Sequence, residues 1–258
     1  MEVCIGILIP FLGTTLGAAC VFFMKNSSGS AAQRLLNGFA AGVMTAASVW
    51  SLLLPALRES AHMGKWSFVP AAAGLWCGFL FLRLIDALLP LLKRYSDAAA
   101  HSGSRMRQTA MLVLTVTLHN IPEGMAVGAV YAGYLAGDGQ ITAAGALALS
   151  VGIALQNLPE GAIVSLPLRA AGKQKRHAFL GGAASGAVEP LGALLTVLAA
   201  RAVVPALPYF LSFAAGAMLS VVAEELIPEA VGDKRRHDGL LLFALGFGLM
   251  MILDVALG

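Results

Sequence analysis

The chain has 258 residues, of which 58% are hydrophobic and 12% are charged, and its mean hydropathy is +0.80. Soluble globular domains contain about 25% charged residues, so this sequence lacks the charge that a water-facing surface needs. The composition excludes a soluble domain and a disordered chain, and it predicts a polytopic helical protein of the lipid bilayer. The net charge is only +3, and no nucleic-acid partner is expected.

Apolar stretches of about 20 residues, the length that crosses a bilayer as a helix, recur eight times along the chain. The predicted helices lie near residues 3–24, 35–57, 67–92, 109–133, 141–167, 178–200, 208–230 and 239–257. The connections between them are short and leave no room for a second domain. Residues 1–258 are therefore expected to form a single all-α transmembrane domain of eight helices.

Lysine and arginine residues are distributed unevenly over the predicted loops. The first, third, fifth and seventh loops contain thirteen of them, whereas the even-numbered loops contain only Arg58, Lys65 and Arg201. Positive charges accumulate in the cytoplasmic loops of membrane proteins. Both termini are therefore expected outside the cell, and Arg83 is left within a predicted span.

Three motifs occur twice, in helices that are expected to run in opposite directions. They are Phe-Ala-Ala-Gly-x-Met at 39–44 and 213–218, Gly-Phe with a later Asp at 78–86 and 246–254, and His/Gln-Asn-x-Pro-Glu-Gly at 119–124 and 156–161. This pattern predicts a 3+2+3 arrangement of helices with inverted pseudo-symmetry, which is common in secondary transporters. The alternative is chance similarity between helices that are rich in Ala and Gly.

Several carboxylates fall within predicted spans, where an ionisable side chain is costly and usually functional. They are Glu123, Glu160, Glu189, Glu224 and Glu225. A single arginine within the spans cannot neutralise them all. A bound cation is the simplest compensation for so much negative charge.

The spacing of the polar residues supports a cation site. His119 and Glu123 are four residues apart and share one helix face, and Gln156 and Glu160 repeat this spacing. A proline before each glutamate removes a helical hydrogen bond, which is tolerated where a helix lines a polar cavity. Imidazole with carboxylate and amide oxygens suits first-row divalent metals. The alternative is that these groups only join two helices by hydrogen bonds.

The motif His119-Asn-x-Pro-Glu-Gly124, followed by a second Pro-Glu helix, resembles the ZIP (Zrt/Irt-like) divalent-metal transporters. Gln156-Asn-x-Pro-Glu is similar to the prokaryotic, GufA-like branch of that family. The resemblance covers essentially the whole chain. It implies a multi-pass protein of the prokaryotic inner membrane that carries Zn²⁺, or Cd²⁺, Fe²⁺ or Mn²⁺, into the cytoplasm by alternating access. It implies no enzymatic activity and no cofactor, and it is compatible with a homodimer.

The resemblance also implies roles for individual residues. The primary metal site would comprise Met44, His119, Glu123, Gln156 and Glu160. An adjoining site, which makes the centre binuclear and able to hold two ions, would comprise Asn120, Asn157 and Glu189. The path would include Ser51 and Asp254 at the extracellular entrance and Glu225 on the inward exit. Because eukaryotic members usually carry His and Glu where Gln156 and Asn157 stand, strict selectivity for zinc is not expected.

Other classes of function are less well supported by the sequence. A membrane-embedded metal sensor would need a signalling domain, for which the short loops leave no room. A proton-coupled carrier of organic solutes would need an aromatic or basic pocket, whereas the predicted site is small and anionic. The sequence contains no His-Glu-x-x-His run, no Ser/His/Asp order typical of a protease and no nucleotide-binding loop.

Overall fold

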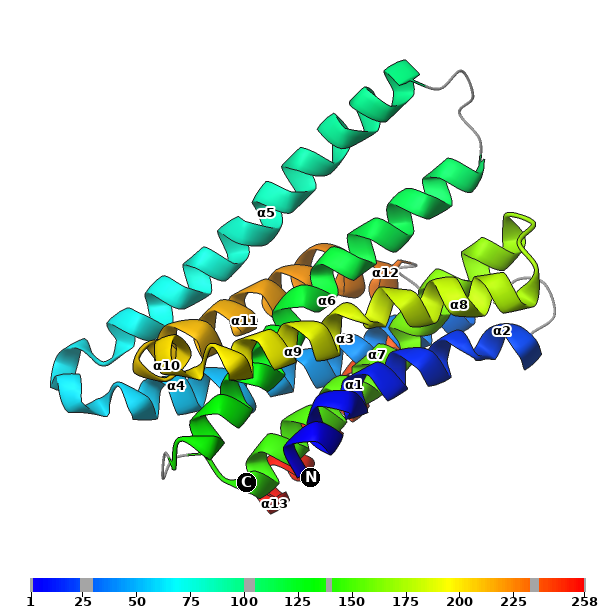
Figure 1. The fold of residues 1–258 in the computed structure, drawn as a ribbon. Helices are drawn as coiled ribbons and strands as arrows, with labels where there is room; N and C mark the ends of the chain where they lie inside the picture. Colours follow the sequence, from blue (N-terminus) through cyan, green and yellow to red (C-terminus); the bar gives the residue numbers. More distant parts are fainter. Residues whose placement is uncertain (1, 24–29, 100–104, 138–140, 233–236, 258) are drawn as a thin grey trace.

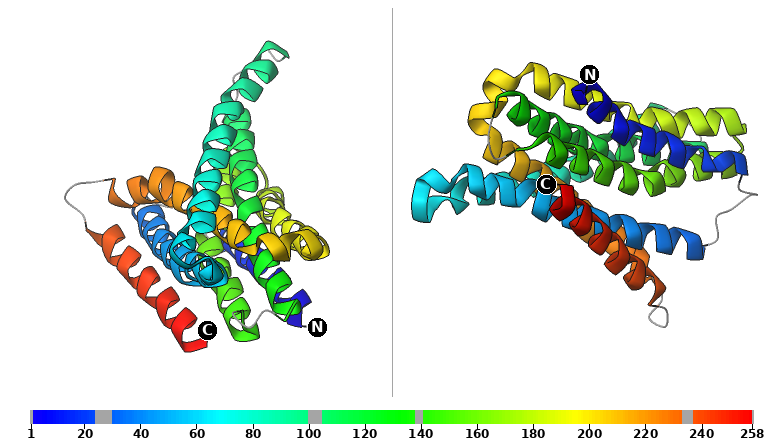
Figure 2. Two further views of the ribbon diagram at one scale, coloured as in Figure 1. Left: turned by 90° about the vertical axis from the view of Figure 1, so that its left-hand side faces the viewer. Right: turned by 90° about the horizontal axis from the view of Figure 1, so that it is seen from below.

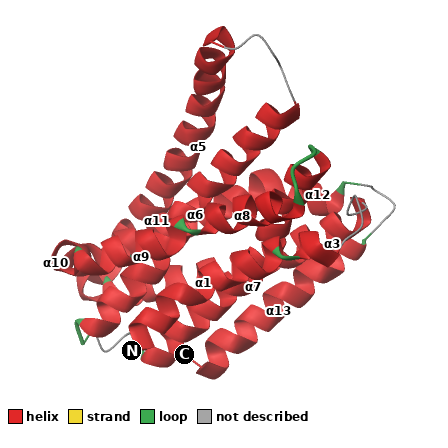
Figure 3. Ribbon diagram, turned by 45° about the vertical axis from the view of Figure 1, so that its right-hand side comes forward, coloured by secondary structure: helices red, strands yellow, loops and turns green. Residues whose placement is uncertain are grey.

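The computed structural model describes residues 2–23, 30–99, 105–137, 141–232 and 237–257. Across these residues every regular element is a helix, and no strand is present (Figure 3). The helices are long and run roughly alongside one another as a bundle (Figure 1). This agrees with the all-α membrane protein that the composition predicts.

In the first half of the chain, the predicted spans 3–24 and 35–57 are each divided into consecutive helical segments, whereas 67–92 and 109–133 fall largely or wholly within single helices. The elements are α1 (Glu2–Ala18), α2 (Cys20–Phe23), α3 (Ser30–Ala47), the π-helical η1 (Ser48–Leu53), α4 (Leu54–Glu59), the 3-10 helix η2 (Ala61–Trp66), α5 (Phe68–Ala99) and α6 (Arg105–Leu135). The second half contains α7 (Ala143–Ala170), α8 (Lys175–Gly186), α9 (Val188–Leu198), α10 (Ala200–Val203), the 3-10 helix η3 (Val204–Ala206), α11 (Leu207–Val221), the π-helical η4 (Val222–Leu226), α12 (Ile227–Val231) and α13 (Asp238–Leu257).

Seven stretches of the described chain are long and apolar enough to cross a bilayer. They coincide with seven of the eight predicted spans, so the chain is a multi-pass membrane protein. The eighth predicted span, 109–133, lies within α6, which has 31 residues. This helix is less apolar because it contains His119, Asn120 and Glu123, and its crossing of the membrane stays a prediction.

Two helices extend beyond the ends that hydropathy predicts for them. α5 runs to Ala99 instead of residue 92, and α6 begins at Arg105 instead of residue 109. Together they project from the rest of the bundle (Figure 1). The apolar stretch of the sequence ends at Lys93 and Arg94, but lysine, arginine and alanine favour helix formation. The helix therefore continues where the apolar sequence stops.

The predicted spans 35–57 and 208–230 each contain a wide π-helical turn, which the sequence analysis did not anticipate. η1 ends two residues before Pro55, and η4 ends two residues before Pro228. Proline has no backbone N–H and clashes with the carbonyl four residues earlier, so an α-helical turn cannot close there. π-Helical turns of this kind are frequent at functional sites.

The recurring motifs make equivalent contacts in the structure. A methyl group added to Gly78 on α5 would collide with the carbonyl oxygen of Phe213 on α11. One added to Gly246 on α13 would collide with the carbonyl oxygen of Phe39 on α3. Phe39 and Phe213 begin the two copies of one motif, and the two glycines begin the copies of another. The contact between α5 and α11 is thus repeated between α13 and α3, which lie side by side at the edge of the bundle (Figure 2).

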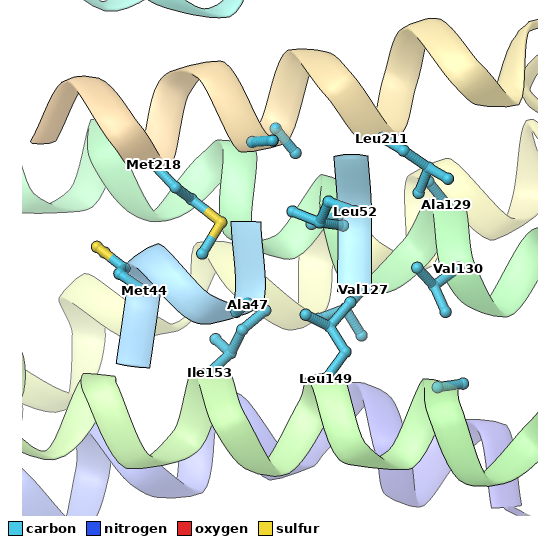
Figure 4. Packing of buried hydrophobic residues seen from close by; sticks show 14 of the residues in the cluster. Met44, Ala47, Leu52, Val127, Ala129, Val130, Leu149, Ile153, Leu211 and Met218 are labelled. Carbon is cyan, nitrogen blue, oxygen red and sulfur yellow. The ribbon is translucent and has the colours of Figure 1, made fainter. Parts of the chain in front are cut away.

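An apolar cluster joins α3, η1 and α11 to α6 and α7 (Figure 4). Among its members are Met44, Ala47, Leu52, Val127, Val130, Leu149, Ile153, Leu211 and Met218. On α6 and α7, the cluster residues lie between the predicted metal site and the end of the bundle at which both ends of the chain lie. Both ends lie together, away from the projecting ends of α5 and α6 (Figures 1 and 2). The cluster therefore closes that half of the bundle.

Candidate metal centre

Glu189 is the point at which four helices meet. Its carboxylate is 1% exposed and accepts hydrogen bonds from Thr14 on α1, Asn120 on α6 and Asn157 on α7. The donor–acceptor distances are 2.9, 3.1 and 2.8 Å, respectively. Glu189 lies in the first turn of α9. The structure thus brings together the three residues predicted for the adjoining site and adds Thr14, which the sequence analysis missed.

Two glycines explain why these helices come so close together. A side chain at Gly124 would collide with the carbonyl oxygen of Glu189, and one at Gly161 would collide with that of Thr14. Each glycine lies four residues after an asparagine, on the same helix face. The absence of a side chain lets α9 and α1 approach until the asparagine amides reach the carboxylate.

The residues predicted for the primary site lie beside this junction. Gln156 Nε2 donates a hydrogen bond of 2.9 Å to Glu123 Oε1, and both side chains are buried. Glu160 is also buried and lies close enough to Glu123 and Glu189 to interact with both electrostatically. Three carboxylates on three helices therefore share one small, enclosed region.

Six of the predicted ligands each have a buried polar atom without a hydrogen-bond partner in the described part of the chain. These atoms are His119 Nε2, Asn120 Oδ1, Glu123 Oε2, Gln156 Oε1, Asn157 Oδ1 and Glu160 Oε2. Buried polar atoms are almost always satisfied in folded proteins, and exceptions often mark the place of a water molecule or an ion. Five of the six are oxygen acceptors, so this set suits a cation.

The donor set is mixed in its chemistry. Among the described residues, no group of three or more His, Cys, Asp or Glu side chains is arranged to hold a metal ion by itself. An ion in this region therefore requires the amide oxygens of Asn120, Gln156 or Asn157 in addition to carboxylates. Amide oxygens are harder and weaker ligands than imidazole, which favours a site of low selectivity among divalent metals.

The imidazole of His119 lies close to two other helices. Its Nδ1 lies 3.5 Å from Glu225 Oε1 in η4, and its Nε2 lies 3.7 Å from Asp86 Oδ1 on α5. Glu225 is the predicted exit residue. Asp86 was not predicted for the site, although its repeat with Asp254 in the sequence could have indicated it. The imidazole thus connects the central carboxylates to a second acidic region.

The predicted entrance residues are also in contact. Ser51 Oγ donates a hydrogen bond of 2.5 Å to Asp254 Oδ1. They line a cavity of about 280 Å³ together with Trp50, Arg58 and Thr142. Ser51 lies in η1 and Glu225 lies in η4, so each π-helical turn holds one predicted path residue, whereas Asp254 lies on α13.

Met44 stands apart from these polar groups. Its side chain is buried in the apolar cluster, which also contains Met218 from the second copy of its motif (Figure 4). The role of Met44 as a metal ligand stays a prediction.

The fold and the site define a class of protein: a multi-pass helical membrane protein whose buried carboxylates, amides and imidazole converge between helices. Residues 95–254 match a model of the family described as ZIP zinc transporter. The chain belongs to the ZIP family.

Three relatives illustrate the breadth of this similarity. Zinc transporter ZIPB of Bordetella bronchiseptica is 38% identical over 96% of this chain and 79% of its own length. Zinc transporter GufA of Myxococcus xanthus is 35% identical over 81% of each chain, which agrees with the predicted branch. Zinc transporter ZIP11 of Homo sapiens is 34% identical over 95% of this chain and 94% of its own.

Proposed function

We propose that this protein carries divalent transition-metal ions across the membrane, with Zn²⁺ as the first candidate substrate. The observation that supports this most directly is a set of five buried carboxylate and amide oxygens on α6 and α7 that have no hydrogen-bond partner among the described residues. The relatives named as zinc transporters support the same class of substrate. Cd²⁺, Fe²⁺ and Mn²⁺ are further candidates, because raw affinity alone rarely makes a site selective among divalent metals.

The centre that we propose holds two ions. The primary ion would be bound by His119, Glu123, Gln156 and Glu160, with Met44 as a further ligand. The second would be bound by Asn120, Asn157 and Glu189, which already share hydrogen bonds. His119 also lies beside Asp86 and the proposed exit residue Glu225. We infer that it follows the metal between the centre and the exit.

The transport mechanism that we propose is alternating access between two ends of an inverted 3+2+3 repeat of eight spans. Equivalent contacts of Gly78 with Phe213 and of Gly246 with Phe39 support the repeat. The apolar cluster closes the half of the bundle next to both chain ends, whereas the Glu225 side chain on the other half is 45% exposed. With both termini outside, this arrangement corresponds to a state that is open to the cytoplasm.

Uptake of radioactive zinc into proteoliposomes tests the proposal. The purified protein is expected to carry zinc down its concentration gradient, and Glu123→Gln is expected to abolish uptake because it removes a central carboxylate. Glu2→Gln, which changes an exposed residue at the chain end, serves as the matched control. Uptake no faster than in protein-free vesicles, with cadmium and manganese also tested, would contradict the proposed function.

A further inference from the structure

Arg83 forms an ion pair that the proposed transport path does not explain. Its Nη1 lies 2.9 Å from Glu224 Oε2, and the side chains are 63% and 40% exposed. Both residues lie within stretches that are apolar enough to cross a bilayer. Exposed ion pairs contribute little to stability, and charged residues within membrane spans usually face a water-filled cavity or a functional site. The position of this pair therefore calls for a functional explanation.

The ion pair borders the acidic region around His119. Asp86 lies three residues after Arg83, on the same face of α5, and it approaches the imidazole. Glu225 follows Glu224 in the wide turn η4 and approaches the imidazole from the other side. Asp86, Glu229 and Glu224 all lie close enough to Glu225 to interact with it electrostatically. Glu229 accepts hydrogen bonds from Asn37 and Gln33. Four carboxylates and one imidazole thus surround the proposed exit, and of these carboxylates Glu229 is held by amide donors and Glu224 by Arg83.

We propose that Arg83 is a positioning residue for metal release: it holds Glu224 in an ion pair and keeps this carboxylate away from the departing metal. The inference rests on the proposed function. Three free carboxylates with an imidazole would chelate a divalent cation and retain it. A guanidinium suits this task because it stays charged at every physiological pH and binds a carboxylate directionally.

The other end of the proposed repeat supports this interpretation. Counted from the recurring motifs, the position that corresponds to Arg83 is Met251, and the position that corresponds to Glu224 is Trp50. Asp254 there is hydrogen-bonded to a serine instead of facing a second carboxylate. Arg83 and Glu224 therefore occur together at the Glu225 end of the repeat. Neither has a counterpart at the Asp254 end.

Charge-changing variants at the two positions test the inference because they should act in opposite directions. Arg83→Met releases Glu224, which adds a carboxylate oxygen, a ligand that divalent metals favour, so metal retention is expected to rise several-fold and turnover should fall. Glu224→Gln removes the carboxylate, so retention should equal or fall below that of wild type. The double variant should return both quantities to wild-type values, and Arg83→Lys should remain close to wild type.

The measurements are zinc bound per purified protein after gel filtration and the initial rate of zinc uptake into proteoliposomes. Gel filtration also shows whether each variant is folded, and Arg83→Gln replaces Arg83→Met if the latter is not. If the single variants slow uptake alike and the double variant does not recover, the pair is only structural and the inference is wrong. Wild-type behaviour of Arg83→Met would also overturn it. Failure of the wild type to carry zinc would instead contradict the proposed function.

Discussion

Thr14 on α1 donates a hydrogen bond of 2.9 Å to Glu189 on α9, although 175 residues separate them in the chain. Their backbones also contact the two recurring motifs in the same way, Thr14 at Gly161 and Glu189 at Gly124. They therefore occupy corresponding places in the proposed repeat. One of these two corresponding positions holds a hydroxyl and the other holds a carboxylate. The two asparagines therefore share one carboxylate and not two.

Replacement of Thr14 should reveal how much this contact contributes. Thr14→Val keeps the shape but leaves the buried carboxylate with one donor fewer, which is expected to lower the stability of the metal-free protein by about 1–3 kcal/mol. Thr14→Ser should retain most of the stability. Thermal unfolding in detergent measures the stability of both variants. Added zinc should narrow the difference between Thr14→Val and the wild type if an ion binds Glu189. Equal losses for valine and serine would show that packing, and not the hydrogen bond, is responsible.

The central ligands should be indispensable for transport. His119→Ala and Glu123→Ala each remove a donor from a cavity where bulk water cannot fully replace it. Zinc uptake at low metal concentration is expected to fall at least about tenfold, because even outer partners of a bound metal contribute 10–100-fold. Leu241→Ala, on the exposed face of α13, is the control for expression and insertion. Normal uptake by both alanine variants would refute the assignment.

Asn157→Asp should change the second site in two ways. Without metal, the new carboxylate replaces an amide that donates to Glu189, so repulsion should lower the thermal stability. With metal, the added charge should tighten the second site, since a contact ion pair at an effective dielectric of about 20 is worth about 4 kcal/mol before desolvation. Calorimetric titration with zinc, fitted to two affinities, measures this effect. An unchanged second affinity would mean that Asn157 does not face the ions.

The predicted orientation can be tested in the loop between α5 and α6. A cysteine at Ser102, which lies outside the described residues, should react only with reagents that reach the cytoplasm, because thirteen positive charges set this side. The experiment needs a cysteine-free background, since Cys4 and Cys77 are exposed. Labelling of intact cells by an impermeant reagent would reverse the orientation.

Several properties could be predicted from the sequence because they depend on residues that are close together in the chain. Apolar composition and 20-residue hydropathy indicated the membrane class and the approximate spans. The four-residue spacing of His119 and Glu123, and of Gln156 and Glu160, placed each pair on one helix face. The family resemblance was visible in the same short motifs, and the match of residues 95–254 agrees with it.

Only the tertiary structure determines which helix faces meet and at which positions along the helices they are in contact. Glu189 accepts from three helices because glycines let their backbones approach, and no local pattern encodes that register. The pairing of Arg83 with Glu224 and the position of His119 between Asp86 and Glu225 likewise join residues from different helices. Hydropathy and helical periodicity act over a few residues, whereas such contacts depend on close packing between segments that are distant in the chain.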